Sequence, residues 1–513
     1  MGKLLFSLLF FNSFLLFSQT PTIQWQRALG GTYDETASSI QQTSDGGYIV
    51  FGSTKSNNWD VSGNHSNANS DYWVVKLNNV GTIQWQKCYG GAAEEIATFA
   101  QQTSDGGYIV AGYSSYPGGD VTVNFGGYDY WMVKLDVGGN IQWQKSLGGT
   151  GHDLAKSIHQ TLDGGYILAG ISNASSIGNI MTGNYWIVKL DNSGVIQWQN
   201  TLALSSGLNE YCSIQQTTDG GYVFTGGFFD YTIIKFNNLG SVQWQKSYGG
   251  AGGNQGATCI QQTTDGGYIV AGYSDSNNDG DVTGNHGSND YWVIKLDNLG
   301  NLQWQKSLGG TDSDKAYSIQ QTTDGGYIVA GTSYSINGDI ASHIGTSGNA
   351  DCWIVKLTSI GTIEWQKSLG GTRDDYAYSI KQTIDGGYVF AGSTKSHDVD
   401  VSGNSWWTSN AFYPLDYWVV KLNASSVGIN ANINLANPSS VYPNPNNGQF
   451  TITSEAIPEN TTAIIYNALG EEVYQKKIVQ PSEMINTNLG YGIYLLKVLS
   501  DKEVTIQKII IDK

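Results

Sequence analysis

The sequence predicts an all-β fold: a seven-bladed β-propeller with four-stranded blades, followed by a small C-terminal β-sandwich. Three short elements predict the propeller, because each recurs seven times: a tryptophan between two Gln or Glu residues, Asp-Gly-Gly-Tyr, and an Asp-Tyr-Trp-like element. The first element places its tryptophans 46 to 61 residues apart, at Trp25, Trp85, Trp143, Trp198, Trp244, Trp304 and Trp365. Self-similarity at this period indicates one repeated supersecondary unit, and a unit of four short strands is a propeller blade.

Each repeat contains four segments of strand character. In the fifth repeat these are 258–263, 268–273, 291–296 and 302–306. The Asp265-Gly266-Gly267 turn joins the first two, because glycine tolerates the positive φ of tight hairpins. A long polar loop separates the second and third segments, and in the fourth apolar and polar residues alternate with a period of two.

The phase of the repeats predicts that the ring is closed. The array begins with a fourth-type strand at residues 22–27 and ends with a third-type strand around Trp418. The leading segment therefore supplies the missing strand of the seventh blade, which removes two exposed sheet edges.

Strand direction predicts where variable material gathers. Because strands alternate in direction within a blade, the tight turns lie on one face, and the long loops and inter-blade loops lie on the other. The long loop of the seventh repeat carries an aromatic cluster absent from the other copies. We therefore treat four residues as candidate ligand-binding residues, for a carbohydrate or a peptide: Trp406, Trp407, Phe412 and Tyr413. The same cluster is also consistent with packing over the closure seam.

The long loop of the fifth repeat is a candidate cation site. Asp275, Asn277, Asp279 and Asp281 alternate along it, and Ca²⁺ prefers six to eight oxygen ligands. A trailing bidentate Glu is lacking, and such side chains also cap turns by bonding their own backbone. No other cofactor is expected.

Composition restricts the partners. The formal net charge is -17, which disfavours nucleic acid and anionic membranes. Residues 1–18 have the lysine and short apolar run of a signal peptide, and no later stretch is long enough to span a bilayer. We expect a monomer. Cys212 and Cys259 occupy nearly matching repeat positions, so a disulfide between them and free buried thiols are both open.

The C-terminal residues carry a set of motifs at fixed order. Tyr442, Pro443, Asn444, Pro445 and Gly448 form a Tyr-Pro-Asn-Pro-x-x-Gly opening; residues 470–473 read Gly-Glu-Glu-Val; and Gly490, Tyr494 and Lys508 fall in a final pair of strands. These motifs resemble the type A-like C-terminal sorting domain of type IX secretion cargo, here joined to a propeller with Asp-Gly-Gly-Tyr repeats. The resemblance implies recognition by the type IX secretion machinery, and location outside the cell or on its surface.

The expected organisation is a signal peptide over 1–18, the propeller over 20–423, a linker over 424–440 and the sorting domain over 441–513. No residue pattern of a known enzyme is found. We therefore expect a secreted or surface-bound, non-catalytic binding or adhesion propeller. Two alternatives stay open: a glycan-degrading enzyme with an unidentified Asp/Glu pair on the long-loop face, and a purely structural surface protein.

Overall fold

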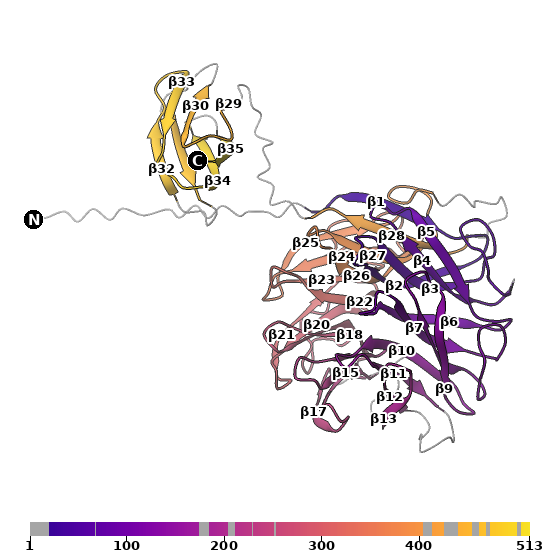
Figure 1. Cartoon of the computed structure of the whole chain (residues 1–513). Helices are drawn as coiled ribbons and strands as arrows, with labels where there is room; N and C mark the ends of the chain where they lie inside the picture. Colours follow the sequence, from indigo (N-terminus) through magenta and orange to yellow (C-terminus); the bar gives the residue numbers. More distant parts are fainter. Residues whose placement is uncertain are drawn as a thin grey trace, which may run out of the picture. The chain divides into compact units, whose positions relative to one another are not determined.

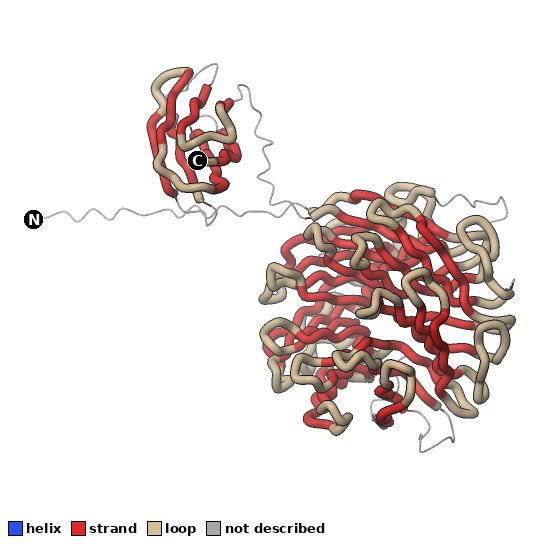
Figure 2. Tube along the Cα trace, in the orientation of Figure 1, coloured by secondary structure: helices blue, strands red, loops and turns tan. Residues whose placement is uncertain are grey.

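The structure is a computed structural model in which every described element is a strand (Figures 1 and 2). It describes residues 20–66, 68–173, 184–203, 211–227, 229–250, 253–403, 413–424, 440–453, 461–467, 472–499 and 504–512. Contacts divide these into two compact units, one ending at Ser425 and one beginning at Ser426. Each is described by itself.

The first unit is built from seven four-stranded antiparallel sheets that follow one another along the chain. Blades one to four are β2 (Glu35–Gln42), β3 (Tyr48–Thr54), β4 (Asp71–Leu77) and β5 (Ile83–Tyr89); β6 (Glu95–Gln102), β7 (Tyr108–Ser114), β8 (Asp129–Leu135) and β9 (Ile141–Leu147); β10 (Asp153–Gln160), β11 (Tyr166–Ser172), β12 (Asn184–Leu190) and β13 (Ile196–Leu202); and β14 (Ser213–Gln216), β15 (Tyr222–Gly226), β16 (Tyr231–Phe236) and β17 (Val242–Tyr248).

Blades five to seven are β18 (Gln255–Gln262), β19 (Tyr268–Ser274), β20 (Asp290–Leu296) and β21 (Leu302–Leu308); β22 (Asp314–Gln321), β23 (Tyr327–Ser333), β24 (Asp351–Leu357) and β25 (Ile363–Leu369); and β26 (Asp375–Gln382), β27 (Tyr388–Thr394), β28 (Asp416–Leu422) and β1 (Ile23–Leu29). The predicted strands of the fifth repeat match β18 to β21, each with small shifts of its ends.

The ring is closed by its leading strand, as the sequence predicts. β1 pairs antiparallel with β28, from Ile23 opposite Leu422 to Leu29 opposite Tyr417. The indole of Trp418 donates a hydrogen bond of 3.0 Å to the side chain of Gln26, the same bond that its counterparts make within their own blades. Blade seven therefore contains both ends of the propeller.

The Asp-Gly-Gly turns hold each blade at one end. In blade five, Gly266 has φ +80° and the N–H of Gly267 donates to the Asp265 carboxylate. The ammonium of Lys295 lies 2.8 Å from the same carboxylate. The pattern recurs in all seven blades, with the pairs Lys76–Asp45, Lys134–Asp105, Lys189–Asp163, Lys235–Asp219, Lys295–Asp265, Lys356–Asp324 and Lys421–Asp385. The repeated lysines are thus neutralised within their own blade.

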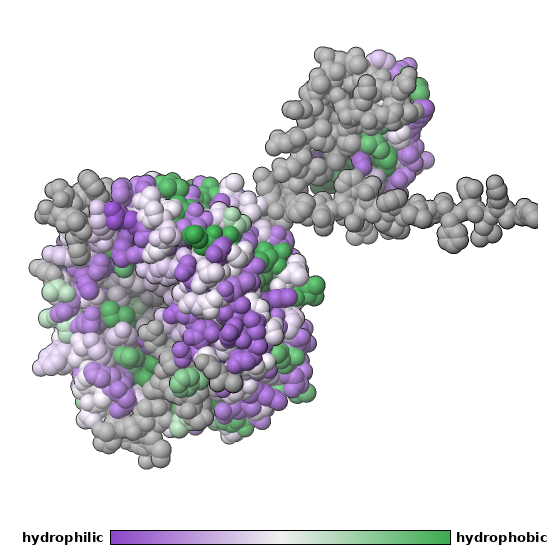
Figure 3. Space-filling view, turned by 180° about the vertical axis from the view of Figure 1, so that it is seen from behind, coloured by the Kyte–Doolittle hydropathy of each residue, from purple (hydrophilic) through white to green (hydrophobic). Residues whose placement is uncertain are grey.

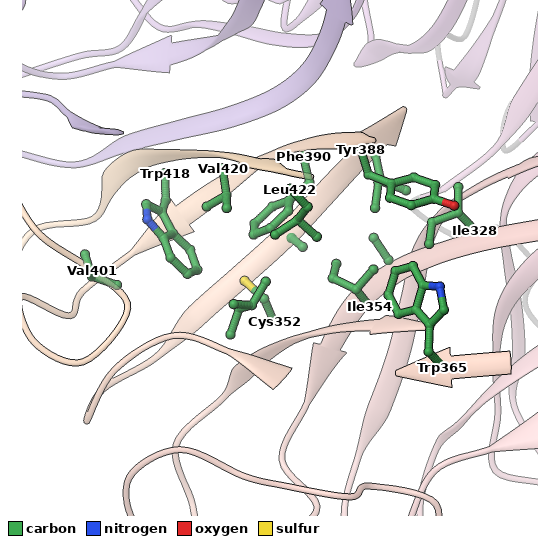
Figure 4. Close-up of a cluster of buried hydrophobic side chains, with 14 of the residues drawn as sticks. Ile328, Cys352, Ile354, Trp365, Tyr388, Phe390, Val401, Trp418, Val420 and Leu422 are labelled. Carbon is green, nitrogen blue, oxygen red and sulfur yellow. The ribbon is translucent and has the colours of Figure 1, made fainter. Parts of the chain in front are cut away.

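Neighbouring blades are joined through the Asp-Tyr-Trp element. The Tyr291 hydroxyl donates to the backbone carbonyl of Trp353 in the next blade at 3.0 Å, and Tyr417 donates to Trp73 across the closure. Apolar side chains fill the space between sheets, as Figure 4 shows between blades six and seven, where Cys352 and Ile354 face Trp418 and Phe390. The repeated aromatic residues therefore belong to the core.

The second unit is a two-sheet sandwich. One sheet has the order β29-β30-β33 and the other β32-β31-β34-β35. The strands are β29 (Ser440–Tyr442), β30 (Gln449–Thr453), β31 (Thr462–Tyr466), β32 (Glu472–Lys477), β33 (Ser482–Asn486), β34 (Gly492–Leu499) and β35 (Val504–Ile511). Phe450, Ile465 and Leu496 are buried between the sheets.

The cysteines and the predicted absence of a membrane span can also be compared with the structure. All four cysteines are free, so the alternative of a Cys212–Cys259 disulfide is wrong for this structure. In the part of the chain that the structure describes, no helix has the length and apolar character needed to cross a membrane. The predicted signal peptide lies outside the described residues.

Candidate functional site

The long-loop face holds one described member of the aromatic cluster. Trp406, Trp407 and Phe412 lie outside the described residues, but Tyr413 is described, and the Arg373 guanidinium carbon lies 3.3 Å from its ring centroid. The two side chains line a cavity of about 330 Å³ together with Asn349, Thr372, Asp374 and Lys395. Tyr413 therefore lies at a cavity between the loops of blades six and seven.

This cavity is polar and partly self-compensated. The Lys395 ammonium lies 2.9 Å from the Asp374 carboxylate. The Nε of Arg373 is buried and has no hydrogen-bond acceptor among the described residues. A cation stacked on an aromatic ring can hold a polar ligand against a flat surface.

The calcium candidates lie in one loop but do not converge. Asp275 accepts hydrogen bonds from the backbone and side chain of Asn254, and Asp281 accepts the N–H of Gly249 at 3.2 Å. Asn277 is exposed. Among the residues described, no group of three or more His, Cys, Asp or Glu is arranged to hold a metal ion. Asp275 and Asp281 dock the loop onto the preceding inter-blade loop, and calcium binding stays a prediction.

The aspartate of the recurring long-loop motif has the same docking role in several blades. Its carboxylate accepts the N–H of the first glycine of the inter-blade loop. The five pairs are Asp60–Gly30, Asp120–Gly90, Asp281–Gly249, Asp339–Gly309 and Asp400–Gly370. The acidic rim read from the sequence is therefore largely engaged in holding loops.

Carboxyl pairs do occur, but inside the blade interfaces. A Cβ on Gly370 would lie 2.5 Å from a carboxyl oxygen of Asp375 and 3.2 Å from one of Asp351, so both carboxyls lie close to the same glycine. Both are fully buried, and burial raises the pKa of each to about 7; the charge of Asp351 adds to the effect on Asp375, and that of Asp400 adds to the effect on Asp351. Similar pairs are Asp71–Glu95, Asp129–Asp153, Asp290–Asp314 and Asp416–Glu35. A glycosidase pair must reach its substrate, and these pairs are shut off from solvent.

The sequence did not single out the cavity in the central channel, whose volume is about 310 Å³. Most of its wall comes from the first strands of the seven blades, with Tyr113 of β7 and with Tyr211 and Cys212, which precede β14. The lining residues are Thr36, Ser38, Ile96, Ala97, Thr98, Phe99, Tyr113, Lys156, Ser157, Tyr211, Cys212, Ser213, Thr258, Cys259, Tyr317, Ser318, Tyr378, Ser379 and Lys381. Among the described residues, that wall includes two lysines and no carboxylate, although the chain has a net charge of -17.

A β-bulge in the first strand of six blades brings the variable residues into this channel. In blade six, the pairing of β22 with β23 shifts between Ala316 and Ser318, so Tyr317 is the extra residue. The six bulge residues are Ser38, Thr98, Lys156, Thr258, Tyr317 and Tyr378. All six line the channel cavity, and the signal available in the sequence was the variation at the position that follows the repeated alanine of the first strand.

The sorting motif residues gather at the last strand of the sandwich. The Asn444 side chain accepts the N–H of Ile510 and donates to the carbonyl of Lys508, both at 2.8 Å. Gly448 has φ +97° and donates its N–H to Asn446, while the Tyr494 hydroxyl donates to the carbonyl of Gly490. The opening motif is thus held along β35.

Comparison with known families identifies the second unit. Residues 440–512 match the family described as the secretion system C-terminal sorting domain. The chain therefore carries the sorting domain expected from its motifs, and the protein is exported and placed outside the cell or on its surface.

Other similarities are more distant. The regulatory protein FlaEY of Caulobacter vibrioides is 25% identical over 114 residues, and the match spans 21% of this chain but only 12% of FlaEY. A fungal alcohol oxidase of the AA5 family, solved with copper, has a TM-score of 0.43 at 12% identity, covering 96% of this chain and 99% of its own. The WD40 domain of Neurospora crassa Pan2 has a TM-score of 0.40 at 9% identity, covering 77% and 97%.

Proposed function

We propose that this protein is an extracellular, non-catalytic binding module that engages a carbohydrate or peptide with the long-loop face of its propeller. The observation that carries the proposal is the cavity at Tyr413 and Arg373, formed between loops of blades six and seven. An aromatic ring beside hydrogen-bond donors suits a sugar ring or a planar peptide group.

The carboxylates on this face support binding over catalysis. Asp60, Asp120, Asp281, Asp339 and Asp400 are engaged with backbone N–H groups of neighbouring loops. The closer carboxyl pairs are buried between blades. On the side of the propeller seen in Figure 3, hydrophobic side chains form separate small groups among hydrophilic ones.

The test is a glycan and peptide array probed with the full chain and with four variants: Tyr413→Ala, Arg373→Ala, Trp406→Ala and Trp407→Ala. Binding is expected, with a loss of about tenfold or more in the Tyr413 and Arg373 variants. The matched control is Tyr33→Ala, which removes an exposed tyrosine from the inter-blade loop of blade one.

A reducing-sugar release assay on the same glycans separates the enzyme alternative. Release of sugar by the protein, unaffected by the four substitutions, would favour a glycan-degrading enzyme. Absence of any glycan or peptide ligand on the arrays would favour a purely structural surface protein.

A further inference from the structure

We propose that the central channel binds a small organic carboxylate with a planar, aromatic body, held by Lys381 and Lys156 against the tyrosine-lined wall. This site is separate from the loop face and does not depend on the function proposed for that face. The proposal stands on charge, on the shape of the wall and on departures from the repeat.

Lys381 is a cation without a counter-ion. Each of the seven repeated lysines near the tight turns has a carboxylate within 3 Å, whereas Lys381 has no ion pair or hydrogen bond among the described residues. Its surroundings lower its pKa through desolvation. A charge held in an enclosed site without a partner is costly, and a bound anion would remove that cost.

The thiols close to the two lysines add no negative charge to the channel. Burial raises the pKa of Cys212, close to Lys156, to about 12, and burial also raises the pKa of Cys259, close to Lys381. Both therefore stay neutral at physiological pH. The electrostatic balance of the channel is positive within the described residues that line it.

The two lysines stand where the repeat otherwise uses residues that join blades. At the position of Lys381, Gln41, Gln101, Gln261 and Gln320 each accept a backbone N–H of the next blade, at 2.7 to 3.0 Å. A lysine cannot accept that bond. His159 is the other described departure at this position, and its ring packs 4.8 Å from Phe99.

The bulge position shows the same departure. The hydroxyls of Ser38, Thr98 and Thr258 donate to backbone carbonyls of the next blade at 2.7 to 2.9 Å. Lys156, Tyr317 and Tyr378 occupy this position in other blades and line the same cavity. Larger residues that replace Ser or Thr in several blades, and that all line one cavity, indicate a ligand site.

The aromatic residues that line the channel suit a ligand with a planar, aromatic body. Tyr317 lies between Tyr211 and Tyr378, with ring centroids 5.8 Å and 5.3 Å away, and Phe99 and Ile96 also line the cavity. A volume of about 310 Å³ is at the small end of ligand pockets. A carboxylate on a planar body uses this aromatic wall, whereas inorganic phosphate would leave it unused.

The experiment measures binding to the full chain by calorimetry and ligand-observed NMR. The probes are benzoate, 4-hydroxyphenylacetate, the neutral benzamide, acetate and inorganic phosphate. Aromatic carboxylates are expected to bind at least about tenfold more tightly than benzamide and acetate, because only they use both the charge and the wall.

The variant Lys381→Gln restores the residue found in most other blades, and it is expected to fold with unchanged or raised thermal stability. It should weaken aromatic carboxylate binding at least about tenfold. Lys156→Thr, copying Thr98 and Thr258, is the second variant should the first fail to fold. Lys246→Gln, which makes the same charge change on the outer strand β17, is the matched control and should bind as the unmodified protein does.

Three results would overturn the proposal: no binding of either aromatic carboxylate at millimolar concentration, equal binding of benzamide, or loss of carboxylate binding in Lys246→Gln as large as in Lys381→Gln. Tighter Lys381-dependent binding of phosphate than of the aromatic carboxylates would also overturn it, in favour of an inorganic anion site.

Discussion

The buried carboxyl pairs predict that the propeller loses stability as pH rises from 5 to 8. Asp351 shows the effect clearly: it is fully buried, and burial raises its pKa from 3.8 to about 7. The folded protein therefore keeps a proton on this group over a pH range in which the unfolded chain has released it. Because the pKa is raised, the stabilisation is complete below the unfolded value and is lost as pH passes the folded value.

The magnitude follows from the shift. A carboxyl with a pKa of 3.8 in the unfolded chain and about 7 in the folded protein contributes about 3 kcal/mol less to the free energy of unfolding at pH 8 than at pH 5. The substitution Asp351→Asn removes this titration, and Asn184 occupies the equivalent place in the third repeat. Between pH 5 and pH 8, the free energy of unfolding of the variant should therefore change by about 3 kcal/mol less than that of the unmodified protein.

Urea unfolding followed by tryptophan fluorescence, at pH 5 and pH 8, measures the difference. His343 lies 3.2 Å from Asp351, so the companion variant Asp129→Asn tests a pair of a different make-up. Burial raises the pKa of Asp129 to about 6, which corresponds to a smaller change of about 1 kcal/mol. The reasoning is refuted if the unmodified protein gains stability between pH 5 and pH 8, or if neither variant alters the slope.

Two further predictions concern closure and turn packing. Deleting residues 20–29 removes β1 and exposes the edge of β28. Size-exclusion chromatography with light scattering should then show larger species, and calorimetry should show a lower melting temperature. An unchanged profile would contradict closure by this strand. Gly300→Ala places a Cβ 2.7 Å from the Trp244 ring at φ +78° and should cost about 2–4 kcal/mol, whereas Gly266→Ala, at φ +80° with open space around it, should cost about 1–2 kcal/mol. Equal urea midpoints for the two variants would rule out the ring contact as the cause.

Much of the fold follows from the sequence, because each repeated residue has the same structural role in every blade. Trp418, Gln26 and Asp265 could be placed in a strand, in a closing strand and in a tight turn from spacing alone. In the C-terminal sandwich, the sequence predicts strands at β30, β31, β34 and β35 but not at β29, β32 or β33. The segments of β32 and β33, Glu472–Lys477 and Ser482–Asn486, are mostly polar and lie at partly exposed positions, so they lack the apolar signal of a strand.

The candidate sites were harder to predict, for two physical reasons. Asp275 and Asp281 are spaced as ligands would be, but their spacing along the chain says nothing of the glycine N–H groups that a neighbouring loop brings to them. The channel residues were missed because a bulge interrupts the period of two. An alternating pattern assigns Tyr317 and Tyr378 to a sheet face without showing that six blades aim this position at one axis.

The bulge also explains how a repeat this uniform can carry a specific site. The extra residue has no partner in the β3-type strand beside it, so its side chain can change without disturbing the ladder. Buried positions such as Ala316 and Ile319 have no such freedom, since they pack between sheets. Substitutions therefore cost the least stability at the bulge and at the nearby glutamine position. Lys156, Tyr317, Tyr378 and Lys381 occur at these two positions. A ring of blades converts these independent changes into one cavity, because every first strand borders the same channel.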